Sequence, residues 1–239
     1  MAESQPQALP PEQLVKPPLP GEKRLGLTVI SVHPLAHGML VISRGSVVDF
    51  QGDAIFNAAN TGCLGGGGVD GAISAAGGQE LDAARRALPI VGKSRTRCET
   101  GDAKITVGGS LAASWVVHAV GPNYAVMKGL GKTVQEGHEL LRSAYARSMD
   151  VVRDAGGIET IAFSLLSSGI FRGQQPLERV LEIGLEAVAA HAFAGLREVH
   201  MCAFTPEEVA TLAELAPAVA ALAPGDRCPA TAAAGGSAA

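Results

Sequence analysis

The sequence predicts an α/β domain with three layers, α/β/α, in which a central sheet lies between two layers of helices. Short apolar runs of the kind found in strands alternate along the chain with one-sided helical stripes. Such alternation is typical of helices that cover the faces of a sheet. The chain has 239 residues, 47% of them hydrophobic and 18% charged, which is enough for one ordinary domain with a core.

Six short runs have the composition of strands. They span residues 27–32, 39–43, 54–56, 115–120, 160–166 and 198–204. Turn-forming pairs, His33-Pro34 and His37-Gly38, separate the first two runs. Loops that follow the strands of such a sheet gather at one rim, where open α/β sheets bind their ligands.

Helical patterns occupy the segments between the strands. They cover residues 69–76, 81–88, 140–152 and a stretch after Pro176 whose inward-facing residues are Leu177, Val180, Leu181, Leu185 and Val188. Pro89 and the pair Gly156-Gly157 end the second and third of these helices. The last helix begins at residues 205–208, Thr-Pro-Glu-Glu, which combine an N-cap, a proline at the first helical position and a capping-box glutamate.

Both ends of the chain are expected to lie outside the domain, which we place at residues 25–222. Residues 1–24 contain six prolines and no hydrophobic periodicity, which predicts a disordered tail. Residues 223–239 are rich in alanine and glycine and predict a flexible tail. The N-terminal segment lacks the apolar core of a signal peptide, and no run approaches the ~20 apolar residues of a membrane-spanning helix.

Charge and cysteine usage argue against several classes of partner. The net charge of −4 provides no broad cationic field, so neither nucleic acid nor a membrane surface is an expected partner. The four cysteines form no Cys-x-x-Cys pair, which argues against a zinc site or a disulfide scaffold. We therefore expect reduced thiols in a cytoplasmic or nuclear protein that needs no metal and no cofactor.

A run of four glycines, Gly65 to Gly68, carries the strongest functional signal. Asn60 and Asp70 flank the run, a strand-like segment precedes it and a helical segment follows it. A glycine turn between a strand and a helix directs main-chain N–H groups at an anion. The pattern predicts a phosphate-containing ligand with a carboxylate beside it, and a plain glycine linker is the alternative. The residues that define a P-loop or a Rossmann dinucleotide site are missing.

Residues 53–60, Asp-Ala-Ile-Phe-Asn-Ala-Ala-Asn, and residues 65–73, Gly-Gly-Gly-Gly-Val-Asp-Gly-Ala-Ile, resemble the first ligand loop of the macrodomain family, most of all its MacroD-type branch. Three further segments resemble the family in its own order, at residues 100–106, 117–122 and 162–171. The resemblance covers roughly residues 29–215. It implies a mixed six-stranded sheet and ADP-ribose as the ligand.

The resemblance also implies roles for single residues. Asn60 is expected on the hydroxyls of the distal ribose, because a carboxamide can donate and accept at once. Asp70 is expected to orient or activate a water molecule near that ribose. The structural alternatives are that Asn60 caps a turn and that Asp70 stabilises the start of a helix. Asn57 and Asp53 are interpreted as structural.

Two loops are expected to hold the diphosphate with main-chain N–H groups. The first loop contributes Gly66, Gly67, Gly68 and Val69, and the second contributes Ser167, Ser168, Gly169, Ile170 and Phe171. By resemblance, Phe171 lies near the distal ribose. Phe204, at the end of the last strand, is the candidate for packing on adenine, with an ordinary core phenylalanine as the alternative.

Three departures from the family pattern concern the ligand. Ser46 and Val47, which are also candidate ligand-binding residues, stand where the family usually has Asp-Ile, and that aspartate accepts a hydrogen bond from the adenine amino group. Ser74 stands where MacroD-type proteins commonly have histidine. Residues 171–173, Phe-Arg-Gly, replace a Tyr-Gly-Tyr-Pro continuation, and Arg172 either pairs with phosphate or is a solvated loop residue.

Two functions follow from these expectations. The first is an enzyme that hydrolyses mono-ADP-ribosyl groups from acidic side chains of proteins, deacetylates O-acetyl-ADP-ribose, or does both. The second is a module that binds ADP-ribose without catalysis. Asp70 beside an intact glycine loop favours the enzyme. The expected partners are ADP-ribose, O-acetyl-ADP-ribose or mono-ADP-ribosylated proteins.

Overall fold

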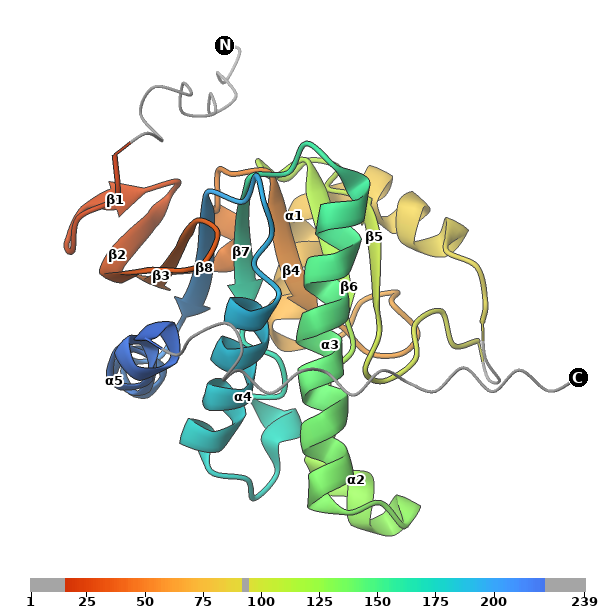
Figure 1. The fold of residues 1–239 in the computed structure, drawn as a ribbon. Coiled ribbons are helices and arrows are strands. Elements are labelled where there is room, and N and C mark those ends of the chain that lie inside the picture. The colour runs from red at the N-terminus through yellow and green to blue at the C-terminus, as the bar shows by residue number, and fades with distance from the viewer. Residues whose placement is uncertain (1–15, 92–94, 222–239) are drawn as a thin grey trace, which may run out of the picture.

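The structure, a computed structural model, describes residues 16–91 and 95–221. This part of the chain forms one sheet with helices on both faces, which confirms the predicted three-layer architecture (Figure 1). The strands are β1 (Lys23–Arg24), β2 (Leu27–Pro34), β3 (Met39–Arg44), β4 (Ala54–Ala58), β5 (Ala103–Val107), β6 (Trp115–Ala119), β7 (Thr160–Ser164) and β8 (Glu198–Ala203). The helices are α1 (Gly68–Ala87), α2 (Tyr124–Met127), α3 (Val134–Ala155), α4 (Leu177–Ala190) and α5 (Pro206–Ala221), with the short 3-10 turns η2 (Val47–Asp49), η3 (Lys128–Leu130) and η4 (Ile170–Arg172).

The sheet is mixed, with the strand order β1-β2-β3-β8-β7-β4-β6-β5. The central strands β3, β8, β7, β4 and β6 are parallel, whereas β1, β2 and β5 add antiparallel pairs at the edges. The carboxyl ends of the parallel strands therefore meet at one rim, and the loops after β3, β4, β7 and β8 lie together there.

The expectation of six strands is wrong, because the described part of the sheet has eight. The two additional strands are β1 and β5. Strand β1 has only two residues and follows a proline-rich segment. Strand β5 is an edge strand, Ala-Lys-Ile-Thr-Val, that is only partly buried. Neither strand has the continuous apolar run by which buried parallel strands are recognised.

The boundary of the fold also differs from the expected one. Strand β1 pairs with β2, and the buried guanidinium of Arg24 forms an ion pair with Glu198 on β8. The fold therefore begins before residue 25, so the end of the expected tail belongs to the domain. Most of the two predicted tails, residues 1–15 and 222–239, lies outside the described residues.

The helices follow the sequence patterns closely. The two patterns at 69–76 and 81–88 lie on the single helix α1, which is interrupted at Gly78, where φ is 65° and ψ is −156°. Pro176 is the N-cap residue of α4. The capping box at α5 is present, because Glu208 N–H donates to Thr205 Oγ1 and Thr205 N–H donates to Glu208 Oε2. Helix α2 has only four residues, and no pattern in the sequence predicts it.

Two hydrophobic cores fix the rim from opposite faces of the sheet. Helices α3, α4 and α5 pack on one face, and α1 packs on the other with η2 (Figure 1). Phe56 on β4 stacks on Phe163 on β7, with ring centroids 3.7 Å apart. The hydroxyl of Tyr145 on α3 accepts a hydrogen bond from Leu166 N–H at 2.9 Å. The loop after β7 is therefore tied directly to the helical layer.

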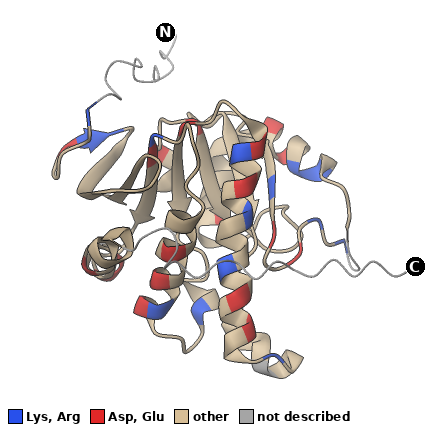
Figure 2. Ribbon diagram, in the orientation of Figure 1, with Lys and Arg blue, Asp and Glu red and all other residues tan. Residues whose placement is uncertain are grey.

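No helix among the residues described is both long and apolar enough to cross a membrane. Figure 2 shows acidic and basic residues interspersed along α3 and α4, in keeping with the small net charge of −4.

Candidate functional site

The rim of the sheet carries two adjoining cavities. The larger has a volume of about 460 Å³ and lies between the loop after β4 and the loop after β7. The smaller, about 340 Å³, lies between the ends of β3 and β8 and the start of α1. Both are lined by Gly68, Val69, Leu165 and Ser168, so the cavities form one continuous groove.

The structure places every predicted site residue on this groove. The larger cavity is lined by Asn60, Gly66, Gly67, Gly68, Val69, Asp70, Ser167, Ser168, Gly169, Ile170 and Phe171. The smaller cavity is lined by Ser46, Val47 and Phe204. Sequence reasoning missed Leu165, which lines both cavities, and Ser164, Cys202 and Glu208, which line the smaller one.

The carboxylate of Asp70 is anchored through one of its two oxygens. Oδ1 accepts hydrogen bonds from Asn57 Nδ2 at 2.8 Å and from Arg85 Nη2 at 3.0 Å. Oδ2 is buried and has no hydrogen-bond partner among the described residues. A Cβ atom added to Gly66 would lie 3.1 Å from Oδ2 and 3.2 Å from Asn60 Nδ2. Glycine at position 66 therefore keeps open the space beside Asp70 Oδ2, the oxygen without a hydrogen-bond partner among the described residues.

Arg85 is a part of the site that sequence reasoning missed. Its side chain is almost completely buried, and it reaches both Asp70 and Ser74 because α1 bends at Gly78. Arg85 Nη1 donates to Ser74 Oγ at 2.6 Å, and Ser74 Oγ donates to the main-chain oxygen of Asp70 at 2.7 Å. Ser74 thus connects the arginine to the start of the helix.

A buried histidine supports the same carboxylate from the sheet. Asn57 Nδ2 also lies 3.2 Å from His118 Nδ1, and His118 Nε2 lies 2.9 Å from Thr106 Oγ1. Burial, with a smaller effect of Arg85, lowers the pKa of His118 to about 3. The ring is therefore neutral, and the amide donor at Nδ1 assigns the proton to Nε2. This chain of hydrogen bonds fixes Asn57, which fits its interpretation as structural.

Asn60 shapes the glycine loop from within. Its Nδ2 donates to the main-chain oxygen of Gly65 at 2.9 Å, and its Oδ1 accepts from Gly62 N–H at 3.0 Å. The turn-capping alternative is thus present in the structure. The side chain nevertheless lines the cavity beside Asp70, so capping does not remove it from the site.

The second loop is held in an uncommon conformation. Ser167 has a φ of 55°, and its hydroxyl donates to the main-chain oxygen of Pro122 at 2.8 Å. Arg172 braces the same loop, because its guanidinium donates to the main-chain oxygens of Ser168 and Gln175 at 3.1 and 3.0 Å. The structure therefore favours a bracing role for Arg172 over either predicted alternative. Strained backbone of this kind is frequent at ligand sites.

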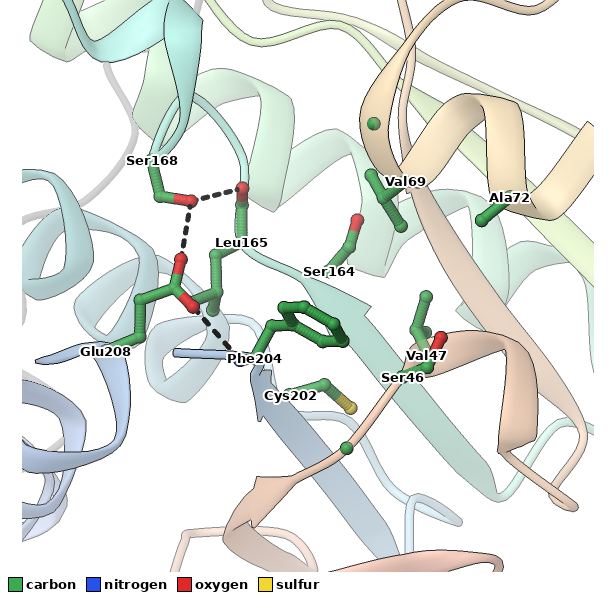
Figure 3. Close-up of a pocket in the computed structure, with 12 residues that line it drawn as sticks. Ser46, Val47, Val69, Ala72, Ser164, Leu165, Ser168, Cys202, Phe204 and Glu208 are labelled. Atoms are coloured by element: carbon green, nitrogen blue, oxygen red, sulfur yellow. Dashed lines mark hydrogen bonds between the residues drawn. The ribbon is translucent and has the colours of Figure 1, made fainter. Parts of the chain in front are cut away.

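Phe204 is not a core residue. Its side chain is 75% exposed, and Figure 3 shows the ring projecting into the smaller cavity, with Glu208 on one side and Ser46 and Val47 on the other. An exposed aromatic face in a cavity is suited to stacking on a nucleobase. Ser46 lines this cavity and also caps η2, since its hydroxyl accepts from Val48 N–H at 3.3 Å.

The groove lacks cationic side chains. None of the described residues that line the two cavities is lysine or arginine. A phosphate group would therefore be held by main-chain N–H groups of the two loops and by the N-terminus of α1. In the described ranges, no group of three or more His, Cys, Asp and Glu is placed to hold a metal ion.

Known sequences are similar to this chain over most of its length. The sequence model of the Macro domain family matches residues 56–183. A macro domain-containing protein of Caldanaerobacter subterraneus is 39% identical over 166 residues, which cover 69% of this chain and 88% of that protein. A protein of Pantoea vagans named O-acetyl-ADP-ribose deacetylase 1 is 36% identical over 149 residues, which cover 62% of this chain and 80% of that protein.

Solved structures are similar as well. The Oceanobacillus iheyensis macrodomain with ADP has a TM-score of 0.69 at 26% identity, over 79% of this chain and 95% of that one. The Trypanosoma brucei macrodomain in complex with ADP-ribose has a TM-score of 0.60 at 30% identity, over 75% of this chain and 68% of that one. The fold is thus that of a three-layer α/β module of the macrodomain type. The chain belongs to the macro domain family.

Proposed function

We propose that the groove binds ADP-ribose in an extended orientation. Adenine would pack on Phe204 in the smaller cavity, and the distal ribose would lie beside Asn60 and Asp70 in the larger one. The diphosphate would then cross the shared part of the groove, between Val69 and Ser168. This orientation is supported by the exposed aromatic ring at one end, the polar side chains at the other and the glycine-rich backbone between them.

We further propose that the protein hydrolyses the ester bond between the distal ribose and an acyl group. Mono-ADP-ribosylated glutamate or aspartate side chains and O-acetyl-ADP-ribose share this bond. The observation that carries the proposal is that the two oxygens of the Asp70 carboxylate differ in their hydrogen bonding. Oδ1 is fixed by two donors, whereas Oδ2 is left without a partner among the residues described. A fixed carboxylate with one free oxygen is suited to accept a proton from an attacking water molecule.

Release of ADP-ribose tests this function. Purified protein is incubated, in buffer containing EDTA, with a glutamate-linked mono-ADP-ribosylated protein and separately with O-acetyl-ADP-ribose, and the products are separated chromatographically. We expect catalytic release of ADP-ribose or of acetate from at least one substrate. Tight binding of ADP-ribose without release, even at stoichiometric enzyme, would instead assign the protein as a non-catalytic reader.

Binding specificity tests the orientation of the ligand separately. Calorimetric titration should give a 1:1 complex with ADP-ribose and a weaker complex with AMP, which has neither the bridged phosphates nor the distal ribose. Equal affinities for the two ligands would contradict the proposed placement of the diphosphate.

We also propose a cytoplasmic or nuclear location, which is supported by the three buried free thiols of Cys63, Cys98 and Cys202.

A further inference from the structure

Glu208 is the one charged side chain among the described residues that line the smaller cavity. It is the third residue of α5. Its Oε2 accepts hydrogen bonds from the main-chain N–H groups of Phe204 at 3.0 Å and Thr205 at 2.9 Å. Its Oε1 points the other way and accepts a hydrogen bond from Ser168 Oγ at 3.3 Å (Figure 3). Helix capping therefore accounts for Oε2 but not for the position of Oε1 at the cavity.

The position of Glu208 along the groove indicates which part of a nucleotide it meets. Ser168 belongs to the loop that would hold the phosphates, and Phe204 is the surface on which the base would pack. Glu208 contacts both residues. In a nucleotide the ribose joins the base to the phosphates, so the ribose on the adenosine side would lie beside Glu208. Ser46 lies on the other side of the Phe204 ring (Figure 3), where the far edge of the base would lie in this orientation.

We propose that Glu208 accepts hydrogen bonds from the hydroxyl groups of the adenosine-side ribose and excludes ligands with a phosphate on that ribose. This inference rests on the binding of ADP-ribose proposed above. A carboxylate is an acceptor without a donor, so it suits a pair of hydroxyls. Dinucleotide-binding proteins use an acidic side chain in the same way to select an unmodified ribose.

The negative charge of Glu208 would exclude ligands that carry a phosphate on this ribose. A phosphomonoester on the 2′-oxygen adds about −1.5 to −2 charges at neutral pH. The described residues that line this cavity include no lysine or arginine to offset that charge. The phosphate would therefore face the carboxylate of Glu208 without compensation, and like charges brought together in an interface oppose binding.

The substitution Glu208→Gln isolates this role. Glutamine also serves in a capping box, so α5 keeps its first turn while the charge is removed. Glu207→Gln is the matched control, because Glu207 is the preceding residue in the same turn, is exposed and lines neither cavity. Thermal unfolding of the three proteins verifies that the cap is intact.

Calorimetric titration with ADP-ribose and with 2′-phospho-ADP-ribose then measures selectivity. We expect the wild-type protein and Glu207→Gln to prefer ADP-ribose by more than about tenfold, a difference set by one uncompensated charge contact. Glu208→Gln should bind ADP-ribose several-fold more weakly and lose most of the preference.

Two outcomes would overturn the assignment of Glu208 and leave the proposed function standing. One is equal affinity of the wild-type protein for both ligands, and the other is an unchanged preference in Glu208→Gln. A third titration, with inosine-diphosphate-ribose, covers contact with the base. If Glu208→Gln altered only the preference for adenine over hypoxanthine, Glu208 would contact the base and the ribose assignment would be wrong. Failure of the wild-type protein to bind ADP-ribose at all would overturn the proposed function itself.

Discussion

Arg85 Nη2 lies 3.0 Å from Asp70 Oδ1, and both side chains are almost completely removed from solvent. The two residues are fifteen positions apart on α1, and the bend at Gly78 brings them together. Ionic groups lose hydration when buried, so such a pair is retained only where its partners satisfy one another. Here Arg85 compensates the charge of Asp70 and leaves the second carboxylate oxygen beside the groove.

Replacement of Arg85 by methionine should be strongly destabilising. The substitution keeps an unbranched apolar stem but leaves the Asp70 carboxylate buried without its cation, which typically costs about 3–5 kcal/mol. The measurement is urea unfolding monitored by circular dichroism. Arg86→Met is the matched control, since Arg86 pairs with Asp82 on the exposed face of the same helix, and we expect no measurable change there. Similar midpoints for the two variants would show that the buried pair does not hold α1 in place.

Asn60→Ala should impair ligand binding and turnover together. The amide of Asn60 holds the glycine loop through Gly65 and Gly62, and it also lines the cavity at the proposed ribose position. Loss of two hydrogen bonds of about 1 kcal/mol each would allow the loop to move. Titration with ADP-ribose and the release assay on the same protein provide the test. Undiminished affinity would exclude Asn60 from the ribose site.

Ser46→Asp should strengthen binding of the adenine end. Ser46 lines the smaller cavity and caps η2, and aspartate is an equally good cap, so the local fold should persist. A carboxylate that accepts from the adenine amino group makes a charge-assisted bond, and we expect roughly tenfold tighter binding of ADP-ribose. Discrimination against inosine-diphosphate-ribose should rise as well. Unchanged affinity for both ligands would mean that position 46 does not reach the base.

Stability should depend on pH through His118. Burial lowers the pKa of His118 to about 3 from an ordinary value near 6.5, so the unfolded chain binds a proton that the folded protein excludes. The contribution of neutral His118 to the free energy of unfolding is complete above pH 6.5, and it is lost as the pH falls from 6.5 toward 3. His118→Asn should remove up to about 1.4 kcal/mol per pH unit from the slope of unfolding free energy between pH 5 and 6.5.

Urea unfolding at several pH values measures this slope. His37→Asn serves as the control, because His37 is exposed in a turn before β3. An identical slope in wild type and His118→Asn would contradict a neutral, buried imidazole at this position.

The sequence predicts the residues of the groove well because they follow strand ends in an ordered set of motifs. Asn60, Asp70 and the segment 167–171 converge for that reason. Arg85 is not predicted as a site residue, because the sequence does not show that the helix bends at Gly78. Only that bend brings Arg85 to Asp70. Glu208 is recognised in the sequence only as a capping residue, and its second oxygen becomes relevant only once β8 places it beside the second loop. Edge strand β5 is missed because its burial is partial.

We propose that Asp70 acts in the hydrolysis itself and does not merely hold the ligand. The most direct measurement compares Asp70→Ala with the wild-type protein in two assays, the rate of ADP-ribose release from a mono-ADP-ribosylated glutamate and the calorimetric affinity for ADP-ribose. We expect the rate to fall by about 10²-fold or more, the scale of losing a positioned general base, while the affinity is retained or rises slightly. Turnover at the wild-type rate in Asp70→Ala would contradict the account.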